Sequence, residues 1–598
     1  MSSQHGGAII GEHLARHGVQ FMFTLCGGHI SPILTGARAA GIRVVDVRDE
    51  KHAVFAADAV ARMTGTVGVA AVTAGPGVTN TITAIKNAQM AQSPIILFGG
   101  ATPTILKGRG ALQDIDQLVL LKPLTKWATS VRTVKSLGPV VDKAIEVATS
   151  GTPGPVFIEV PVDVLYPEEI VRQWFMSESG VQNAKTFGAK ALQLYLKGHL
   201  YRQFNQPHIP VDFANPIDQL TQTFDALPLD SVPFPIGRDT EALIDAAADA
   251  LRTAKQPVLV IGSQALANCS PARAEELADA VRLLGLPVWL GGTSRGLLGK
   301  THDAQFRHQR SKALKEADVV VIAGFPFDFR LGYGRKINRK ATLIAANLNT
   351  EDLRKNRRPD IGVQMHSADF LIKLAERLGS LGPFDGWLAT LTEREQARDA
   401  EIAEMAGEPS ELINPLDFFL RLEAKMADNS VMVVDGGDFV ATASYIISPR
   451  RPLSWLDPGV FGTLGVGGGF AVGAALCRPS AEVWLIYGDG SSAYSLSEFD
   501  TCVRHGLAPI AVIGTDGSWA QIAREQVEIL DDDIGTTLLR TDYHKVAEGY
   551  GAVGLLLTDP AKIDETLDEA KRLAASGKPV CVNVHINKSD FRKGSISM

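Results

Sequence analysis

The sequence predicts an α/β protein made of doubly wound domains with parallel sheets. Short apolar runs, such as 44–47, 67–73 and 156–160, are typical of buried parallel strands, and stretches of helix length separate them. The runs 482–487 and 509–513 flank a segment long enough for a crossover helix, which predicts one βαβ unit. With 598 residues, of which 45% are hydrophobic, the chain is long enough for about three domains.

The composition excludes several classes of protein. The net charge is −7 and no dense Lys/Arg block occurs, so we expect no nucleic-acid partner. The five cysteines are scattered without a CxxC pair, which favours reduced thiols in a cytoplasmic protein over a disulfide framework or a zinc site. The N-terminus lacks the pattern of a signal peptide, and no run approaches the ~20 apolar residues of a membrane helix. We therefore expect a cytoplasmic protein, with no transmembrane segment, that acts on a small molecule.

Two acidic residues, Asp489 and Asp516, each follow one of the apolar runs of the predicted βαβ unit. The carboxyl ends of parallel strands are where open α/β sheets bind ligands. Two carboxylates there suit a hard divalent cation that shares its shell with phosphates, and flanking glycines let the backbone approach a diphosphate. Asp-Gly is also common in turns, so the spacing alone leaves a pair of strand-end turns open.

Gly488-Asp489-Gly490 followed by Thr515-Asp516 resembles the signature of thiamine-diphosphate enzymes, in which GDG precedes an Asn-Asn or Asn-Asp pair. The resemblance implies thiamine diphosphate and Mg²⁺ as cofactors, with the metal bound by Asp489, Asp516 and the main-chain carbonyl of Ser518. This chain departs from the signature at Thr515, where the family usually has Asn. Asp516 adds a negative charge where many members carry Asn, which should favour Mg²⁺ binding.

A second motif lies upstream, where a predicted strand at 44–47 leads to Glu50, a helix rich in alanine, another strand and then 73–80. This order resembles the pyrimidine-binding domain of the acetolactate synthase-like group. The resemblance assigns Glu50 to the N1′ atom of the aminopyrimidine, where a carboxylate stabilises the imino tautomer that removes the C2 proton. Taken alone, a Glu at a strand end would more often be a solvated charge.

The stretch 461–467 resembles the GTMGxG segment of the same family, in which a bulky apolar side chain supports the bent cofactor. Leu464 matches that position. The glycines at 465–469 lack GxGxxG spacing and a preceding strand, so they do not indicate a dinucleotide site. By the same resemblance, the residues expected to contact the cofactor are Glu50, Gly75, Asn80, Gly437, Asp438, Leu464, Gly488, Gly490 and Ser491.

The resemblance covers nearly the whole chain and implies three doubly wound α/β domains with parallel sheets. These are a pyrimidine-binding domain at 1–170, a middle domain at 237–375 and a diphosphate- and Mg²⁺-binding domain at 411–598. A charged helical linker is expected at 376–410, and 171–236 reads as an insert with an amphipathic helix at 183–204. The apolar side of that helix is predicted to comprise Phe187, Ala191, Leu194, Tyr195 and Leu200. A lid, an oligomer contact, a membrane-surface helix and a helix packed on its own protein all remain open for it.

His29 and Gln113 occur on two loops that, in the family, reach over the reactive C2 carbon. Benzaldehyde lyase-like members carry His and Gln at these places, whereas acetolactate synthases lack the His. A histidine can move a proton to and from the hydroxyl of the adduct, and Gln113 can donate to the same oxygen. The resemblance therefore implies catalytic roles for both, although His29 alone would also suit a cap or a core position.

Arg310 opens a stretch, 310–323, that looks like the middle domain of 2-hydroxyacyl-CoA lyases and oxalyl-CoA decarboxylases. In those enzymes an Arg there lies at an adenine nucleotide, so the resemblance implies an ADP or CoA site at Arg310. Acetolactate synthases bind FAD in this domain, and their FAD contacts match this chain less well. A surface helix start is the alternative for Arg310.

The stretches 27–32, 87–94, 541–545 and 589–595 also resemble the 2-hydroxyacyl-CoA lyases of this group. A lyase of this type cleaves a 2-hydroxyacyl-CoA to an aldehyde and formyl-CoA. The alternative is a carboligase that decarboxylates pyruvate or 2-oxobutyrate. A non-catalytic scaffold is a third alternative, against which the intact Glu50, Gln113, Asp489 and Asp516 argue. The resemblance further implies a homodimer with shared active sites, often a homotetramer.

Overall fold

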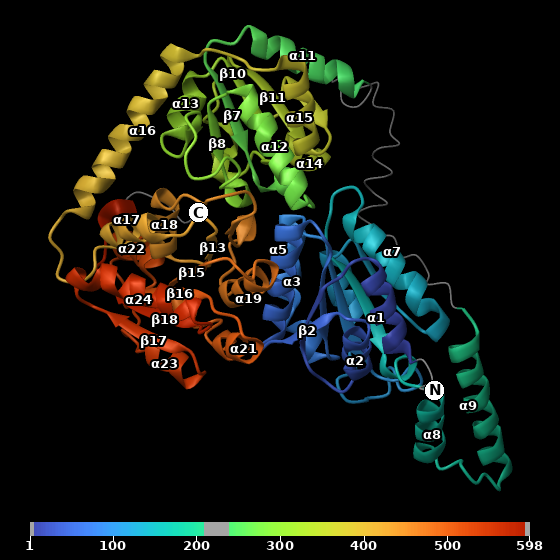
Figure 1. The fold of residues 1–598 in the computed structure, drawn as a ribbon. Helices are drawn as coiled ribbons and strands as arrows, with labels where there is room; N and C mark the ends of the chain where they lie inside the picture. The colour runs from blue at the N-terminus through green and yellow to red at the C-terminus, as the bar shows by residue number, and fades with distance from the viewer. Residues whose placement is uncertain (1–4, 208–238, 593–598) are drawn as a thin grey trace. The chain divides into compact units, whose positions relative to one another are not determined.

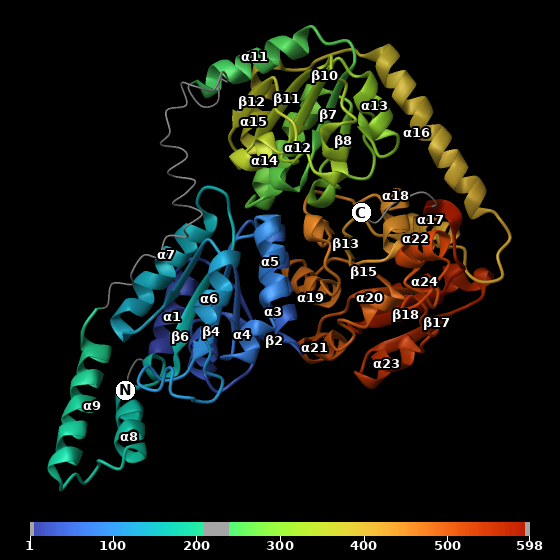
Figure 2. The same cartoon turned by 180° about the vertical axis from the view of Figure 1, so that it is seen from behind.

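The computed structural model describes residues 5–207 and 239–592, which form two compact units. The first unit holds 5–61 and 66–207, and the second holds 62–65 and 239–592. Three six-stranded sheets organise them (Figures 1 and 2), and each pair of neighbouring strands in these sheets runs parallel. The prediction of doubly wound α/β domains with parallel sheets is confirmed.

The first sheet has the strand order β2-β1-β3-β4-β6-β5. Its strands are β1 (Phe21–Leu25), β2 (Arg43–Asp46), β3 (Gly68–Val72), β4 (Ile95–Ala101), β5 (Trp127–Ser130) and β6 (Val156–Pro161). The helices of this part are α1 (Gly6–Arg16), α2 (Ser31–Ala39), α3 (Glu50–Thr64), α4 (Pro76–Thr79), α5 (Ile82–Ala91), α6 (Gln117–Leu121) and α7 (Leu137–Thr149). Apolar side chains of α1, α2 and α7 form one core with the strands.

Two further helices of the first unit, α8 (Glu168–Glu178) and α9 (Phe187–Asn205), pack side by side (Figure 1). The buried face of α9 contains Leu196, Leu200 and Gln203. Of the residues predicted to form the apolar side, Leu200 is buried, whereas Phe187 is 91% exposed, Leu194 is 72% exposed, and Ala191 and Tyr195 are exposed as well. The reason is that α9 carries apolar residues on both faces, and helical spacing alone does not show which face is packed.

The second sheet has the order β12-β11-β10-β7-β8-β9. Its strands are β7 (Pro257–Ile261), β8 (Val288–Leu290), β9 (Gln305–Phe306), β10 (Val319–Ala323), β11 (Thr342–Asn347) and β12 (Ile361–Gln364). The helices are α11 (Thr240–Arg252), α12 (Pro271–Leu284), α13 (Arg310–Glu316), α14 (Thr350–Arg354), α15 (Ser367–Leu378) and α16 (Asp385–Ala406). Helices α11, α12 and α15 contribute to one core, whereas α13 and α16 contribute to another.

The third sheet has the order β14-β13-β15-β16-β18-β17. Its strands are β13 (Val431–Val434), β14 (Trp455–Leu456), β15 (Val483–Gly488), β16 (Ile510–Thr515), β17 (Val553–Leu557) and β18 (Val580–His585). The helices are α17 (Pro415–Lys425), α18 (Asp438–Ile446), α19 (Gly467–Cys477), α20 (Asp489–Ser492), α21 (Glu498–His505), α22 (Ala520–Leu530), α23 (Tyr543–Gly549) and α24 (Ile563–Ala575). Strands β15 and β16 pair in parallel with Gly488 opposite Gly514, which confirms the predicted βαβ unit.

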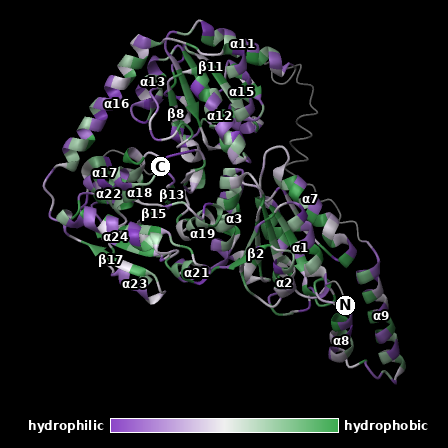
Figure 3. Cartoon of the chain, in the orientation of Figure 1, coloured by the Kyte–Doolittle hydropathy of each residue, from purple (hydrophilic) through white to green (hydrophobic). Residues whose placement is uncertain are grey.

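Hydropathy follows this layering, with apolar strands inside and polar helix faces outside (Figure 3). Helices α9 and α16 carry many polar residues along their length. Across 5–207 and 239–592, no helix combines the length and the apolar character needed to cross a membrane. All five cysteines are free thiols, and Cys269, Cys502 and Cys581 are buried.

Candidate functional site

The three sheets share one topological feature, which is a point where the strand order reverses. This point lies between β1 and β3 in the first sheet, between β7 and β10 in the second, and between β13 and β15 in the third. Ligands of open α/β sheets bind outside the carboxyl ends of the strands at such points. Of the residues predicted from the sequence, His29 and Gly75 follow β1 and β3 in the first unit, and Asp438 and Asp489 follow β13 and β15 in the second. The others follow different strands, namely Glu50 after β2, Gln113 after β4, Arg310 after β9 and Asp516 after β16.

Glu50 is the first residue of α3 and is 8% exposed. Its Oε2 accepts a hydrogen bond of 3.0 Å from Nδ2 of Asn80, the residue that follows α4. The tight turn at 75–79 brings the backbone near the carboxylate, since a Cβ on Gly77 would lie 3.6 Å from Glu50 Oε1. Glu50 is therefore a nearly buried carboxylate with one fixed partner, and not the solvated charge that a strand-end Glu would more often be.

His29 follows β1 by four residues and faces the loop after β3. Its Nδ1 lies 3.2 Å from Thr73 Oγ1, and partial burial lowers the pKa of the imidazole below its ordinary value of 6.5. A Cβ on Gly100 would lie 2.6 Å from His29 Cβ, so the end of β4 supports the ring from behind. A neutral imidazole whose Nδ1 is engaged leaves Nε2 as the nitrogen for proton transfer.

Gln113 lies in the loop between β4 and α6, and its backbone has φ = 62°. Gly75 has φ = 62° as well and packs directly against this loop, because a Cβ on Gly75 would lie 2.8 Å from the carbonyl oxygen of Gln113. Left-handed backbone at a non-glycine residue costs free energy, and it marks a loop whose shape the surroundings impose. The structure thus brings Gln113 and Gly75 together.

Asp489 and Asp516 follow β15 and β16, at neighbouring strand ends of the third sheet. Asp489 is 2% exposed and accepts hydrogen bonds of 2.8 Å from the backbone N–H groups of Gly490 and Gly517. Asp516 accepts a hydrogen bond of 2.9 Å from the backbone N–H of Ser518. Burial raises the pKa of Asp489, and burial followed by repulsion from Asp489 raises the pKa of Asp516 to about 7. Two buried carboxylates that repel each other fit a divalent cation, which would remove the repulsion.

The backbone between these strands is held close at the reversal point of the third sheet. Ser491 Oγ donates to the carbonyl of Gly436 at 2.8 Å and accepts from the N–H of Gly488 at 3.1 Å. Gly437 has φ = 116°, and a Cβ there would lie 3.3 Å from Gly488 Cα. A Cβ on Gly490 would lie 2.5 Å from the Trp519 ring. Only glycine fits at these approaches, because a side chain would meet Gly488 or the Trp519 ring.

Leu464 lies in the turn that precedes α19, and contacts with neighbouring residues hold this turn in place. A Cβ on Gly436 would overlap Leu464 Cδ2. The buried carboxylate of Asp435 accepts hydrogen bonds from the N–H of Gly465 at 3.0 Å and from that of Gly467 at 2.7 Å. Asp435 therefore holds the glycine turn that presents Leu464, and the sequence reasoning missed it.

Asp438 begins α18, and its carboxylate is engaged by cations. Arg524 Nη2 lies 2.5 Å from Asp438 Oδ2, and Arg592 Nη1 lies 3.7 Å from Oδ1. The negative charge of Asp438 also contributes to the raised pKa of Asp516. Asp438 thus lies close to the metal candidates, with its own charge already compensated by arginines.

Arg310 begins α13, and its guanidinium lies 5.7 Å from the centre of the Phe325 ring, which follows β10. It donates to the carbonyl of Arg330 at 2.6 Å. Burial, followed by repulsion from Arg295 and Arg330, lowers its pKa to about 10. Among the residues that the structure describes, neither Arg295 nor Arg310 has a carboxylate within ion-pair distance, and Arg295 donates to the carbonyl of Ser444 at 2.7 Å. The charges of Asp457 and Asp328 act favourably on Arg295 and Arg310 from beyond ion-pair distance, so both guanidinium groups are without a direct ion pair.

Sequence reasoning also missed Gln117 and Glu159, which form a buried network beside Gly75. The signal for Glu159 was its place inside the apolar run 156–160, where a charge is costly. Nothing comparable marked Gln117, whose partners are distant in the sequence.

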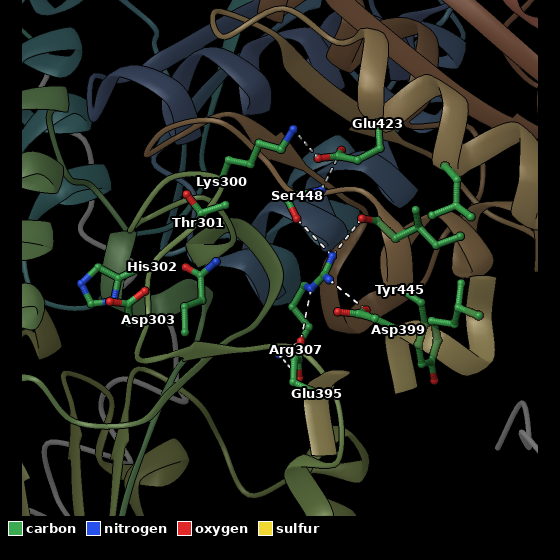
Figure 4. Close-up of a pocket in the computed structure, with 14 residues that line it drawn as sticks. Lys300, Thr301, His302, Asp303, Arg307, Glu395, Asp399, Glu423, Tyr445 and Ser448 are labelled. Carbon is green, nitrogen blue, oxygen red and sulfur yellow. Dashed lines mark hydrogen bonds and ion pairs between the residues drawn. The ribbon is translucent and has the colours of Figure 1, made fainter. Parts of the chain in front are cut away.

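A cavity of about 420 Å³ lies elsewhere in the second unit (Figure 4). Its wall includes Lys300, Arg307, Glu395 and Asp399, and none of the predicted cofactor residues line it. Glu395 and Asp399 can also group with His308 as metal ligands. Arg307 already compensates their charge, since its guanidinium lies 3.4 Å from Glu395 and 3.2 Å from Asp399. This cavity therefore has a polar wall in which ion pairs balance the charges.

The chain is similar to several known proteins and to models of one enzyme family. Models of thiamine pyrophosphate enzymes match the chain over the N-terminal TPP binding domain at 4–120, the central domain at 244–374 and the C-terminal TPP binding domain at 435–584. The 2-hydroxyacyl-CoA lyase 2 of Danio rerio is 46% identical, over 100% of this chain and 94% of the relative, and that of Homo sapiens is 46% identical over 100% and 92%. The acetolactate synthase large subunit IlvG of Mycobacterium tuberculosis is 34% identical over 97% and 96%.

Proposed function

The chain belongs to the thiamine pyrophosphate enzyme family, and from this premise we propose that it is a thiamine-diphosphate- and Mg²⁺-dependent carbon–carbon lyase acting on 2-hydroxyacyl-CoA esters. The products are an aldehyde and formyl-CoA. Similarity over the full length to curated 2-hydroxyacyl-CoA lyases supports this choice of substrate. The single structural observation that carries it is the pair of arginines Arg295 and Arg310, neither of which has a carboxylate within ion-pair distance among the described residues, and which suits the phosphates of a CoA ester.

The cofactor residues divide between the two units. Glu50 would hold N1′ of the aminopyrimidine, and Asn80 would orient the Glu50 carboxylate through its 3.0 Å hydrogen bond. Asp489, Asp516 and the carbonyl of Ser518 would hold Mg²⁺, with Gly437, Asp438, Gly488, Gly490 and Ser491 around the diphosphate and Leu464 beneath the cofactor. Gly75 shapes the turn toward Gln113. When bound, thiamine diphosphate supplies the nucleophilic carbon and takes up the electron pair of the broken C–C bond.

His29 accepts the proton of the substrate 2-hydroxyl on Nε2 as the aldehyde forms, and Gln113 donates to the same oxygen. The lowered pKa of His29 keeps its imidazole neutral near pH 7, which is the state that can accept a proton. Thr73 Oγ1, at 3.2 Å from Nδ1, fixes the orientation of the ring.

A 2-oxo acid carboligase, which decarboxylates pyruvate or 2-oxobutyrate and transfers the acyl unit, is the second candidate. The 34% identity to an acetolactate synthase large subunit over nearly the whole chain favours it. Both candidates use the same cofactor residues. The two candidate enzymes differ at His29 and in the ligand that the second sheet binds. For that ligand we propose ADP or CoA at Arg310, with FAD as the alternative.

Purified protein with thiamine diphosphate and Mg²⁺ is tested against a 2-hydroxyacyl-CoA, pyruvate and 2-oxobutyrate, each with and without an acceptor aldehyde. Products are identified by mass spectrometry. The proposal expects aldehyde and formyl-CoA in equal amounts from the CoA ester. Carbon dioxide and an acyloin from the 2-oxo acids, with the CoA ester unchanged, would replace the lyase by the carboligase.

The proposal includes a homodimer in which Glu50 and Asp489 of different copies complete each site, and a homotetramer formed by two such dimers. We also propose that the chain divides into the predicted domains and linkers at 1–170, 171–236, 237–375, 376–410 and 411–598. We propose a cytoplasmic location, which the five free thiols support. Light scattering of the purified protein measures the oligomeric state directly.

A further inference from the structure

Glu159 is a charged residue in the interior of a parallel sheet. It lies on β6, between β4 and β5, and is fully buried. Its Oε1 accepts from Lys107 Nζ at 2.5 Å and from Ser130 Oγ at 2.8 Å, and its Oε2 accepts from Gln117 Nε2 at 3.0 Å. A buried charge is tolerated only when its partners are complete, and both oxygens of Glu159 are engaged.

Gln117 extends this network toward the candidate site. Its Oε1 accepts a hydrogen bond of 2.9 Å from the N–H of Gly75. Its Nε2 donates hydrogen bonds of 3.0 Å to the carbonyl of Gly100 and to Glu159. The amide of Gln117 is therefore saturated by one carboxylate and two backbone groups. Because the Glu159 carboxylate can only accept, it fixes which end of the Gln117 amide faces Gly75.

The two backbone groups that Gln117 holds are those that support the proposed catalytic side chains. Gly75 abuts the backbone of Gln113, and Gly100 lies behind the Cβ of His29. Lys107 belongs to the same loop as Gln113, so its ion pair with Glu159 anchors that loop to β6. One buried carboxylate thus reaches both sides of the site through hydrogen bonds.

We infer that Glu159 and Gln117 are positioning residues, which keep the side chains of Gln113 and His29 in place through the backbone of Gly75 and Gly100. This inference rests on the proposed function for the roles of Gln113 and His29. Neither Glu159 nor Gln117 touches substrate or cofactor in this scheme. Their effect is geometric, and a misplacement of about 1 Å is enough to slow a reaction by ~10²-fold.

The test uses Gln117→Met in the full-length protein, which keeps the volume of the side chain and removes its three hydrogen bonds. Ser130→Ala is the matched control, because Ser130 binds Glu159 but reaches neither loop. Amide hydrogen exchange should accelerate at Gly75 and across 102–116 in Gln117→Met and stay unchanged in Ser130→Ala. Unchanged exchange at Gly75 would overturn the inference whatever the substrate is.

Kinetics on the substrate found in the screen give the second readout. Gln117→Met should lower kcat by ~10²-fold while KM and the affinity for thiamine diphosphate change less than about threefold. The double variant Gln117→Met/Gln113→Ala should lose less activity than the product of the two single losses, because both changes remove the contribution of Gln113. Losses that multiply in the double variant would overturn the inference.

Glu159→Gln provides a second variant if Gln117→Met does not fold. It keeps an acceptor for Gln117 and removes the ion pair with Lys107, so it should accelerate exchange in 102–116 and lower kcat, with Gly75 less affected. A lower unfolding temperature with unaltered kcat would make the network structural only. A wild-type protein inactive on every substrate would refute the proposed function, while the exchange at Gly75 would still decide the role of Gln117.

Discussion

Asn80 donates a hydrogen bond of 3.0 Å from Nδ2 to Oε2 of Glu50, although 30 positions separate the two residues in the sequence. The bond joins the residue after α4 to the first residue of α3. It leaves Glu50 Oε1 for a ligand and restricts the rotation of the carboxylate. Both residues belong to the first unit, which therefore presents an oriented carboxylate by itself.

The variant Glu50→Gln should retain the cofactor and lose the ability to activate it. We expect exchange of the thiazolium C2 proton, followed by NMR in deuterated buffer, to slow by ~10²–10⁴-fold, as for loss of a general acid–base group. Binding of thiamine diphosphate and Mg²⁺ by calorimetry should stay within a few-fold of wild type. Near-normal exchange in Glu50→Gln would refute the role of Glu50.

Removal of the metal should destabilise the wild-type complex but not Asp489→Ala. Mg²⁺ with thiamine diphosphate at 100 times the dissociation constant should raise the free energy of unfolding by about 2.7 kcal/mol, and a chelator should reverse this. Asp489→Ala should show no such gain, because one of the two buried carboxylates that bind the cation is lost. Asp516→Asn should keep most of it, since the amide oxygen can still bind Mg²⁺.

Thermal unfolding with and without both ligands measures these effects. The exposed Glu408→Ala serves as a control for the loss of one carboxylate. A full ligand-dependent gain in Asp489→Ala would show that the metal binds elsewhere.

The pH dependence of the reaction should report the neutral state of His29. Burial lowers the pKa of His29 below 6.5, so the acid limb of kcat/KM assigned to it should lie below pH 6.5. The folded protein binds this proton more weakly than the unfolded chain, so the free energy of unfolding falls as the pH drops through 6.5 toward the folded pKa. His29→Gln should remove that contribution and flatten the acid limb. An acid limb that persists unchanged in His29→Gln would assign it to another group.

Arg310 should contribute to the affinity for a phosphate-bearing ligand in the second unit. A hydrogen bond to a charged group is worth about 1.5–3 kcal/mol, so Arg310→Gln should weaken ADP and CoA binding by roughly 10- to 150-fold. The surface residue Arg282, which pairs with Asp279, offers Arg282→Gln as a matched control. Equal affinities for ADP and CoA in Arg310→Gln and in wild type, measured by calorimetry, would leave Arg310 a structural residue.

The sequence predicted those parts of the fold that depend on local pattern. Apolar runs identified β15 and β16, and the acidic residues after them lie at neighbouring strand ends, as expected of a parallel pair. The spacing of polar and apolar residues included Leu200 but not the buried Leu196 of α9, because apolar side chains occur on both faces and contacts with α8 and other segments decide which are buried.

The contacts that link distant segments were beyond sequence reasoning. Glu159 attracts notice as an acid in an apolar strand, but its partner Gln117 is 42 positions away and no local pattern joins them. Asp435 is similar, because it accepts from the N–H of Gly465, 30 positions further on. Such hydrogen bonds follow from the way the strands are ordered in the sheet, which a periodicity does not contain.

The placement of Glu50 and Asp489 on separately compact units has a genetic consequence. If two copies complete each other's sites, chains carrying Glu50→Gln and chains carrying Asp489→Ala are each inactive, yet a mixed dimer contains one site with both residues intact. Random re-association of equal amounts of the two would restore about a quarter of the wild-type sites, since half of the dimers are mixed and each has one good site. Two defective alleles would then complement each other, whereas sites built within one copy would give no recovery at all.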